Sequence, residues 1–201
     1  MTPPENLLRR RALADAAIEI LGTRGIHQLS HRAVDDVAGV PAGTASNYFR
    51  NRDGLLQAAA RRAVELHLQE MRQDVQAGAG SLPAAIDREG LADLIGQSLY
   101  RAATLRRTRF QAVFELALEA TRSPALGDVL SGLAAAAVET TIGHHRTLGF
   151  DTDPEQVQAL ITLYSGTLFT LVTGPPQAVT PDTARTLAGY MVNGVLGGVD
   201  V

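Results

Sequence analysis

The stretch from Val40 to Leu56, VPAGTASNYFRNRDGLL, carries its large and cationic side chains at one end. Proline, alanine and glycine follow Val40, and two aromatic residues end the helix-like run before Arg50, Asn51 and Arg52. Arginine can hold phosphate oxygens through several N–H donors, and the small hydroxyl and amide side chains between the two ends add neutral donors. A helix with almost no bulk in its first turn lets its backbone approach another surface closely. This combination is typical of a helix that enters a groove lined by phosphates.

The residues just before this stretch predict a partner helix that would hold it in place. Ser30 can cap a short helix whose inward face carries Val34, Val37 and Ala38, and Gly39 supplies the backbone freedom that a tight turn needs. The apolar residues that would pin the two short helices together as a helix-turn-helix are Val34, Ala38, Val40, Ala45 and Tyr48.

The second helix of such a pair projects its N-terminal residues into the DNA major groove. Two small residues there, Ala42 and Gly43, would let the backbone approach base edges closely. Ser46 can reach a base, and Thr44 and Asn47 can donate hydrogen bonds to phosphate. The pattern therefore predicts a DNA-reading surface at the front of the second helix.

Residues 9–62 resemble the DNA-binding domain of the tetracycline-repressor-like (TetR) family of bacterial transcription regulators. The resemblance rests on GTRG at the end of the first helix, SHRAV, AGVPAGT, and NYFRNRDGLL. It implies that Arg32 reaches a base edge, that Ala42, Gly43 and Ser46 lie over base edges, and that Thr44, Asn47, Tyr48 and Arg52 hold phosphates. It also implies that Phe49 lies in the core. His31 can donate to a phosphate or simply occupy the first helical turn, and Arg9–Arg11 can form a DNA-contacting arm or a solvated helix start.

Asp35 departs from the family pattern, which has a small residue at this position between the two helices. A buried carboxylate without a partner is costly. Pro41 also replaces the usual capping serine or threonine of the third helix. We therefore expect Asp35 to accept from an N–H group at the start of that helix; a position near the DNA would instead weaken binding.

Helical patterns follow one another along the chain, and strand patterns are scarce. Four helices are predicted up to residue 77, at 7–22, from Ser30 to Gly39, ending at Phe49, and at 53–77. The sequence GAGSLP at 78–83 breaks the long fourth helix, and five more helices are predicted near 89–104, 106–121, 124–147, 154–172 and 182–196. Three of these starts carry Ser-Pro, Asp-Pro or Thr-Pro, in which a capping side chain precedes a proline in the first turn. The fold class expected is all-α.

The charge is unevenly divided along the chain. All 18 basic residues are arginine. Residues 1–62 contain nine of them and six acidic residues, a formal charge of +3, whereas the remainder of the chain carries a formal charge of −6. This division suggests two functions in one chain. We expect a helix-turn-helix DNA-binding domain in residues 1–52 and, joined to it by the long helix, an all-helical effector-binding and dimerisation domain in residues 53–201. The chain has no cysteine, which fits a reducing cytoplasm. The uncharged segment Val157–Val172 is shorter than the ~20 residues of a spanning helix and predicts a buried helix, not a membrane segment.

The family resemblance implies that the second domain binds a small-molecule effector and forms a homodimer through its last two helices. Leu187, Met191 and Val195, beside Ala184, Ala188 and Gly189, suggest an interface stripe on the last helix. Larger or polar-tipped side chains on the other helices are candidate ligand contacts: Tyr100, Phe110, Phe114, Leu118, His144, Tyr164 and Phe169. No permanent charge cluster lies among them, which favours an apolar or aromatic effector.

Catalytic and metal-binding patterns are missing from the sequence. There is no G-x-S-x-G, no phosphate-binding loop and no recognisable carboxylate pair. The adjacent histidines of GHHR at 143–146 would point about 100° apart on a helix. We therefore expect no enzyme activity, no cofactor and no metal. The function predicted is a ligand-responsive, sequence-specific transcription repressor that binds a palindromic operator in double-stranded DNA as a dimer. The alternative is a helical small-molecule- or partner-binding protein whose DNA module is weakened, with Asp35 as the cause.

Overall fold

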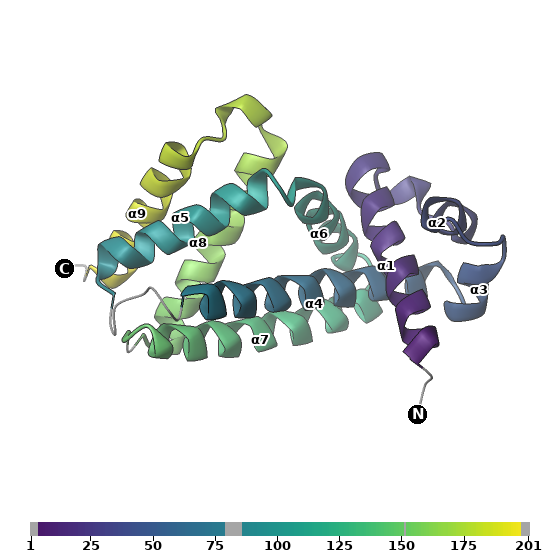
Figure 1. Cartoon of the computed structure of the whole chain (residues 1–201), viewed down its shortest axis with the longest axis horizontal. Helices are drawn as coiled ribbons and strands as arrows, with labels where there is room; N and C mark the ends of the chain where they lie inside the picture. Colours follow the sequence, from purple (N-terminus) through teal and green to yellow (C-terminus); the bar gives the residue numbers. More distant parts are fainter. Residues whose placement is uncertain (1–3, 79–85, 151, 198–201) are drawn as a thin grey trace. The chain divides into compact units, whose positions relative to one another are not determined.

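The computed structural model describes residues 4–78, 86–150 and 152–197, and within these ranges the regular structure is entirely helical (Figure 1). The helices are α1 (Pro4–Arg24), α2 (His31–Ala38), α3 (Thr44–Tyr48), α4 (Arg52–Gly78), α5 (Arg88–Ala103), α6 (Arg107–Ala120), α7 (Pro124–Thr147), α8 (Pro154–Thr173) and α9 (Pro181–Leu196), with 3-10 turns at Ile26–Gln28 and Pro176–Ala178. The all-α fold class predicted from the sequence is confirmed. The break expected at 78–83 lies, apart from residue 78, outside the described residues.

Capping side chains set the helix starts that the sequence pattern predicted. Ser30 accepts from the backbone N–H of Ala33 at the start of α2. Asp153 caps α8 by accepting from the N–H of Gln156, whose side chain accepts in return from the Asp153 N–H. Thr180 caps α9 in the same position before a proline. Each cap satisfies an N–H group that has no partner within its helix.

The first of two compact units comprises Met1–Gln69 and Thr108–Leu133. It contains α1 to α3, the first part of α4, α6 after its first residue, and the beginning of α7. Its core is continuous, and its largest fully buried side chains include Leu13, Ile20, Val34 and Leu55. Phe49 is 2% exposed, which confirms the expectation that it is a core residue.

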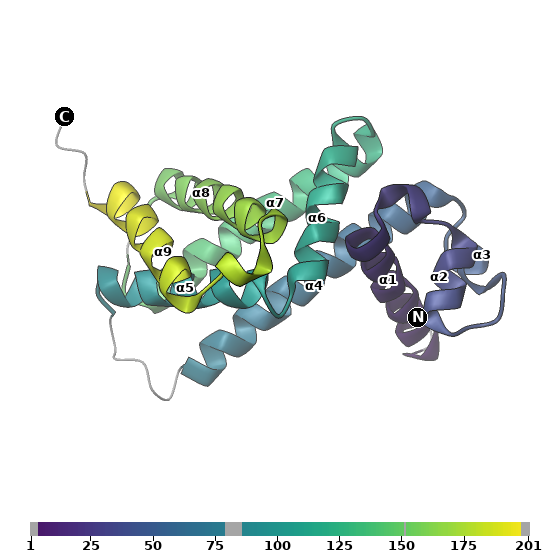
Figure 2. The ribbon, with the colours of Figure 1, turned by 90° about the horizontal axis from the view of Figure 1, so that it is seen from above.

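The second compact unit comprises Glu70–Arg107 and Ala134–Val201. In this unit α5 packs along α9, and both contact α8 (Figure 2). Gly96 allows α5 to approach α9 closely: a Cβ atom at this position would lie only 2.8 Å from the Cα of Arg185. Leu91, Ala92 and Val192 are buried together in this unit with Leu148, which follows α7.

The division of the chain into domains at residue 52 stays a prediction. Helix α4 begins at Arg52, whereas the compact units divide within α4, at the start of α6 and within α7. Among the described residues, only α7 is long and apolar enough to cross a membrane by length and hydropathy. One such helix is weak evidence for a membrane span, because core helices of soluble proteins meet the same criterion. Helix α8, which contains Val157–Val172, does not meet it.

Candidate nucleic-acid interface

Two glycines give the turn between α2 and α3 its shape. Gly39, after the last residue of α2, has φ 63°, and Gly43, before α3, has φ 90°. These left-handed conformations are strained for residues that carry a Cβ atom. The Gly39 N–H donates to the carbonyl groups of Asp35 and Asp36 and closes the end of α2. Gly39 therefore adopts a left-handed conformation of the kind predicted for it, and the turn brings α3 back across α2.

Asp35 holds the start of α3. Its side chain is 1% exposed; Oδ2 accepts from the Gly43 N–H at 2.7 Å, and Oδ1 accepts from the Ala45 N–H at 2.6 Å. The Asp35 side chain thus supplies, from the neighbouring helix, the cap that Gly43 has no side chain to provide. A carboxylate at a helix N-terminus also complements the helix dipole. The partner expected for Asp35 is confirmed, and its side chain is not on the exposed surface.

The other end of α3 is held by side chains from α1 and α2. The His31 Nε2 lies 2.7 Å from the carbonyl oxygen of Phe49, and the Arg10 guanidinium donates to the carbonyl of Tyr48 at 3.4 Å. The same guanidinium lies over the Phe49 ring, 4.8 Å from its centre. A five-residue helix has little stability alone. Here its first N–H groups meet a carboxylate and its last carbonyls meet donors, so α3 is fixed at both ends.

The outer surface of α3 and its approach carries most of the residues predicted to contact DNA. The exposed ones are Arg32, Ala42, Gly43, Ser46 and Asn47, and the half-buried ones are His31, Thr44, Tyr48 and Arg52. The hydroxyl groups of Thr44 and Ser46 donate to the backbone carbonyls of Pro41 and Gly43. Their oxygens remain able to accept hydrogen bonds, whereas donation to phosphate requires rotation of the hydroxyl group. The roles of these nine residues toward DNA stay predictions.

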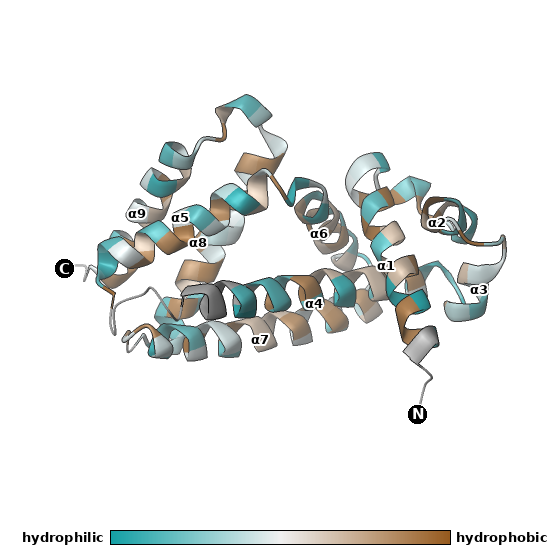
Figure 3. Ribbon diagram, viewed as in Figure 1, coloured by the Kyte–Doolittle hydropathy of each residue, from teal (hydrophilic) through white to brown (hydrophobic). Residues whose placement is uncertain are grey.

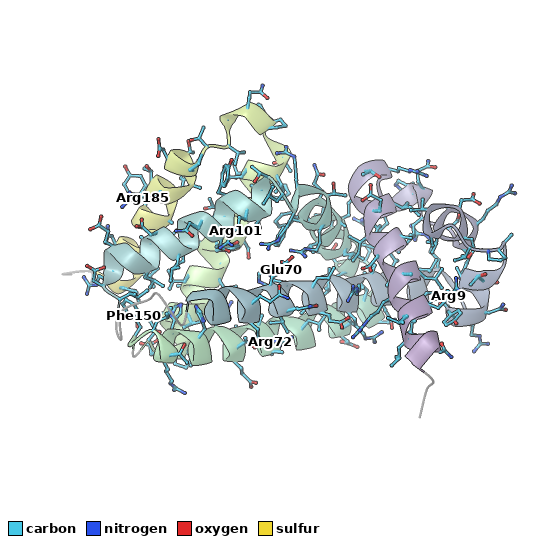
Figure 4. All side chains as sticks on the ribbon, in the orientation of Figure 1. Arg9, Glu70, Arg72, Arg101, Phe150 and Arg185 are labelled. Carbon is cyan, nitrogen blue, oxygen red and sulfur yellow. The ribbon has the colours of Figure 1, made fainter. Side chains whose placement is uncertain are left out.

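Arg52 and the N-terminal arginines have partners within the chain that sequence reasoning did not find. Arg52 donates to the carbonyl of Ile26 at 2.7 Å and thereby holds the 3-10 turn that leads into α2. Arg11 pairs with Glu65 of α4. Arg9 is exposed on α1 (Figure 4). The choice between a DNA-contacting arm and a solvated helix start stays open for Arg9, which is exposed, whereas Arg10 and Arg11 have partners within the unit.

A further ion-pair network ties α1 to α4. Arg62, which is half-buried, pairs with Asp15 at 2.8 Å and with Glu65 at 3.0 Å. The hydrogen bond with Asp15, supported by Glu65, raises the pKa of the Arg62 guanidinium against the opposing effect of burial. Helices α1 and α4 are therefore held together by ion pairs as well as by apolar packing.

The residues predicted to contact a ligand are divided between the two units. Phe110, Phe114 and Leu118 lie in the first unit, and Tyr100, His144, Tyr164 and Phe169 lie in the second. Phe110 meets the His67 ring edge-on at 6.0 Å, and the Tyr164 hydroxyl lies 2.9 Å from that of Ser98. Leu118 and Phe169 are 58% and 44% exposed. Tyr100 lines a groove of about 440 Å³ between α5 and α9. The assembly of these seven residues into one effector site stays a prediction.

The outward face of α8 and α9 differs from what the sequence pattern suggested. Ala184, Ala188 and Met191 are buried within the chain, so the stripe expected at a dimer interface packs partly against α5. The physical reason is that α9 has two apolar faces, and sequence spacing cannot tell which one is covered from within. Helix α8 likewise buries one face only, and Leu163 and Phe169 of α8 and Tyr190 of α9 are exposed. The ribbon coloured by hydropathy in Figure 3 shows hydrophobic, brown segments along α8.

The histidine pair at the end of α7 has a packing role. His145 is buried; its Nδ1 lies 2.8 Å from the Thr152 hydroxyl, and its ring lies against Phe150. Burial lowers the pKa of the His145 imidazole, and the neighbouring His144 lowers it further. No group of three or more metal-ligating side chains is found in the described part of the chain.

Two family models match the chain. Residues 13–59 match the one described as "Bacterial regulatory proteins, tetR family", and residues 86–198 match "Tetracyclin repressor-like, C-terminal domain". The first match contains the helix-turn-helix and its cap, Asp35. The second contains α5 to α9.

Relatives and solved structures agree with these matches. The multidrug binding protein EbrR, solved in complex with ethidium, is 30% identical, with 91% of this chain and 98% of that chain covered and a TM-score of 0.64. A TetR-family member from Streptomyces coelicolor A3 is also 30% identical, with coverage of 91% and 97% and a TM-score of 0.67. The HTH-type transcriptional regulator BetI of Escherichia coli is 41% identical over 54 residues. That alignment covers 27% of this chain and 28% of BetI, so the chain spans about a quarter of the curated relatives it matches.

Proposed function

Since the chain belongs to the TetR family of bacterial regulatory proteins, a family of DNA-binding transcription regulators, we propose that it is an effector-responsive repressor that binds a palindromic operator as a homodimer. Each subunit would place α3 in the major groove of one half-site. Arg32, Ala42, Gly43 and Ser46 would face base edges. His31, Thr44, Asn47, Tyr48 and Arg52 would lie toward phosphates.

The observation that carries this proposal is the bracing of α3. Asp35 at its first turn, and His31 and Arg10 at its last, hold a helix too short to be stable alone. Its outward surface is left with small and polar side chains, of which Ala42, Gly43, Ser46 and Asn47 are exposed. A rigid short helix with a bare front suits close approach to base edges. Positioning of this kind is what sequence reading requires.

The dimer is supported by the outward face of α8 and α9. Leu163, Phe169 and Tyr190 are large exposed apolar or aromatic residues in these two helices. Gly166 and Gly189 have no neighbouring atom within 4 Å of where a Cβ would lie, which lets a second backbone approach closely. A twofold dimer would present two recognition helices to half-sites about one helical turn, ~34 Å, apart.

The effector we propose is an apolar or aromatic small molecule held in the body of the protein. Half-buried Tyr100 and Tyr164 offer aromatic surface with polar tips, and Tyr164 already shares a hydrogen bond with Ser98. EbrR, a structural neighbour, was solved with ethidium and with proflavin, both aromatic molecules. Regulators of this family are generally not enzymes, so the effector would be bound and released unchanged. We place the protein in the bacterial cytoplasm, where its operator would be.

The rival function, a binding protein with a weakened DNA module, rested on Asp35. The buried carboxylate caps α3 and supports its position, so Asp35 no longer argues for that alternative.

Selection of bound duplexes from a random DNA library by the purified full-length protein tests the proposal. We expect recovery of an inverted repeat whose binding falls linearly on a log–log plot against salt, with a slope near −0.9 per phosphate neutralised. A single unrepeated site would contradict the dimeric reading. Retention without sequence preference would contradict operator recognition and favour the binding-protein alternative.

A further inference from the structure

The chain passes between its two compact units at three peptide bonds. Two of these lie inside continuous helices, between Gln69 and Glu70 in α4 and between Leu133 and Ala134 in α7. The third joins Arg107 to Thr108, the first two residues of α6, directly after the turn that ends α5. At this third crossing, two consecutive residues contact different helices.

Arg107 is anchored to the end of α8. Its guanidinium donates to the carbonyl of Gly174 at 2.6 Å and to that of Leu171 at 3.3 Å. The last carbonyls of a helix have no partners within the helix, and a cation there complements the helix dipole. The first residue of α6 is thereby tied to the C-terminal turn of α8.

A neighbouring ion pair joins the first and third crossings. The Arg106 Nε lies 2.9 Å from the Glu70 carboxylate, and the side chains are 25% and 21% exposed. Glu70, labelled on α4 in Figure 4, is the first residue of the second unit in that helix. Within the second unit, the start of α6 is thus held both to α8 and to α4.

Thr108 is anchored in the first unit, against α1. A Cβ atom on Gly22 would lie 2.1 Å from the Thr108 carbonyl oxygen and 2.7 Å from its side-chain methyl, so only glycine permits this approach. Further along α6, Ala112 and Leu116 are buried in the same core as the apolar face of α1. Helix α1 in turn supplies Arg10, which holds the end of α3.

We propose that Arg107 is a positioning residue that couples the C-terminal turn of α8 to α1, through the peptide bond to Thr108 and its packing on Gly22. This inference rests on the proposed effector response and names its route. An effector that shifts the end of α8 would move the first turn of α6. Because backbone meets backbone at Gly22, that movement has no flexible side chain to absorb it. The orientation of α1, and with it of α3, would follow.

Amide hydrogen exchange on the free full-length protein tests the coupling without DNA or effector. In Arg107→Gln we expect roughly tenfold faster exchange in the last turn of α8, the factor for loss of a charge-assisted hydrogen bond, and faster exchange also around Gly22 in α1. The matched control is Arg185→Gln, which removes an arginine that pairs with Glu89 and Asp93 elsewhere in the second unit. Exchange around Gly22 should not change in that variant.

Two results would overturn the proposal. One is faster exchange in α8 alone, which would make Arg107 a local helix cap. The other is an equal change around Gly22 in Arg185→Gln, which would mean general loosening. Coupling must also be reciprocal. Gly22→Ala, which forces α1 away from Thr108, should speed exchange at residues 171–174 of α8. If Gly22→Ala does not fold, Arg107→Gln and its control decide the question alone.

A duplex recovered in the selection experiment separates this inference from the proposed function. In the wild type, the duplex should protect α3 and also change exchange at the end of α8. In Arg107→Gln, protection of α3 should persist while the change at α8 is lost. Absence of protection at α3 in both proteins would contradict operator binding, and the free-protein comparison would still decide the coupling. Persistence of the α8 response in Arg107→Gln would contradict the coupling while operator binding stands.

Discussion

Helix α3 and the α8–α9 pair differ in how much of their hydrogen-bonding and apolar surface the chain itself satisfies. Helix α3 has five residues, yet both its ends are satisfied by side chains from α1 and α2. Helices α8 and α9 are 20 and 16 residues long, yet large apolar side chains on them, Leu163 and Tyr190, remain exposed. The chain itself satisfies both ends of the short helix and so fixes its position, which the proposed role in reading DNA would require. The long pair has apolar surface that a second subunit would cover.

The sharpest way to break this comparison is to remove the cap on α3. Asp35→Ala would remove the acceptor of two N–H groups at the start of α3, those of Gly43 and of the buried Ala45, so we expect a loss of about 2–4 kcal/mol in the free energy of unfolding. DNA binding should fall with it. Chemical denaturation and duplex binding measure the two effects. Asp36→Ala, an exposed acid on the same helix, is the control. A gain in DNA binding by Asp35→Ala would restore the weakened-module alternative.

A charge placed on the uncovered face tests the other half of the comparison. Leu163→Asp on α8 should weaken the dimer by roughly 2 kcal/mol, about a 30-fold rise in its dissociation constant, because burial of an unpaired carboxylate is costly. Sedimentation at several concentrations would show the shift toward monomer. Leu105→Asp makes the same chemical change at a leucine that is 79% exposed, outside α8 and α9. Equal behaviour of the two variants would place the interface elsewhere.

Two exposed arginines near α3 sharpen the division between base and phosphate contacts. Arg32→Ala should cost roughly 1–3 kcal/mol in operator affinity and relax preference at one base pair. Arg50→Ala, at the exposed position after Phe49, should weaken all sequences similarly and reduce the salt slope by about 1. Arg52 is unsuited to this test because it also holds the carbonyl of Ile26. Identical profiles for Arg32→Ala and Arg50→Ala would show that Arg32 does not read a base.

Local patterns were sufficient to predict the helices and the cap of the recognition helix. Helix starts depend on neighbouring residues, so Asp153-Pro154 and Thr180-Pro181 located α8 and α9 to within a residue or two. The Asp35 contact was predictable as well. A buried carboxylate needs a donor, and with Pro41 in place of the usual capping residue the N–H groups at the start of α3 needed an acceptor.

Contacts between distant residues left no such pattern in the sequence. Arg10 reaches a carbonyl 38 residues away, Arg52 one 26 away, and Arg107 one 67 away. Any exposed arginine could make contacts of this kind, and the sequence does not say which carbonyl is within reach. The faces of α9 were ambiguous for a related reason, because both its apolar sides satisfy the same spacing. Ligand contacts depend on how several helices come together, so local sequence patterns predict them even less well.

The smallest effect we predict concerns His145, the buried histidine of the second unit. It tests whether the interior of this unit excludes water, in contrast to the exposed apolar surface of α8 and α9. Burial lowers the pKa of His145 below its ordinary value of about 6.5, so the unfolded chain binds the proton more readily than the folded one. His145 therefore costs no stability above pH 6.5, and stability declines as the pH falls from there through the lower folded pKa. Denaturation measured between pH 8 and pH 5 should show this decline, and it should flatten in His145→Gln relative to His27→Gln, which removes an exposed histidine. An unchanged slope in His145→Gln would mean that water reaches the imidazole, and that the contact between His145 and Thr152 opens readily in solution.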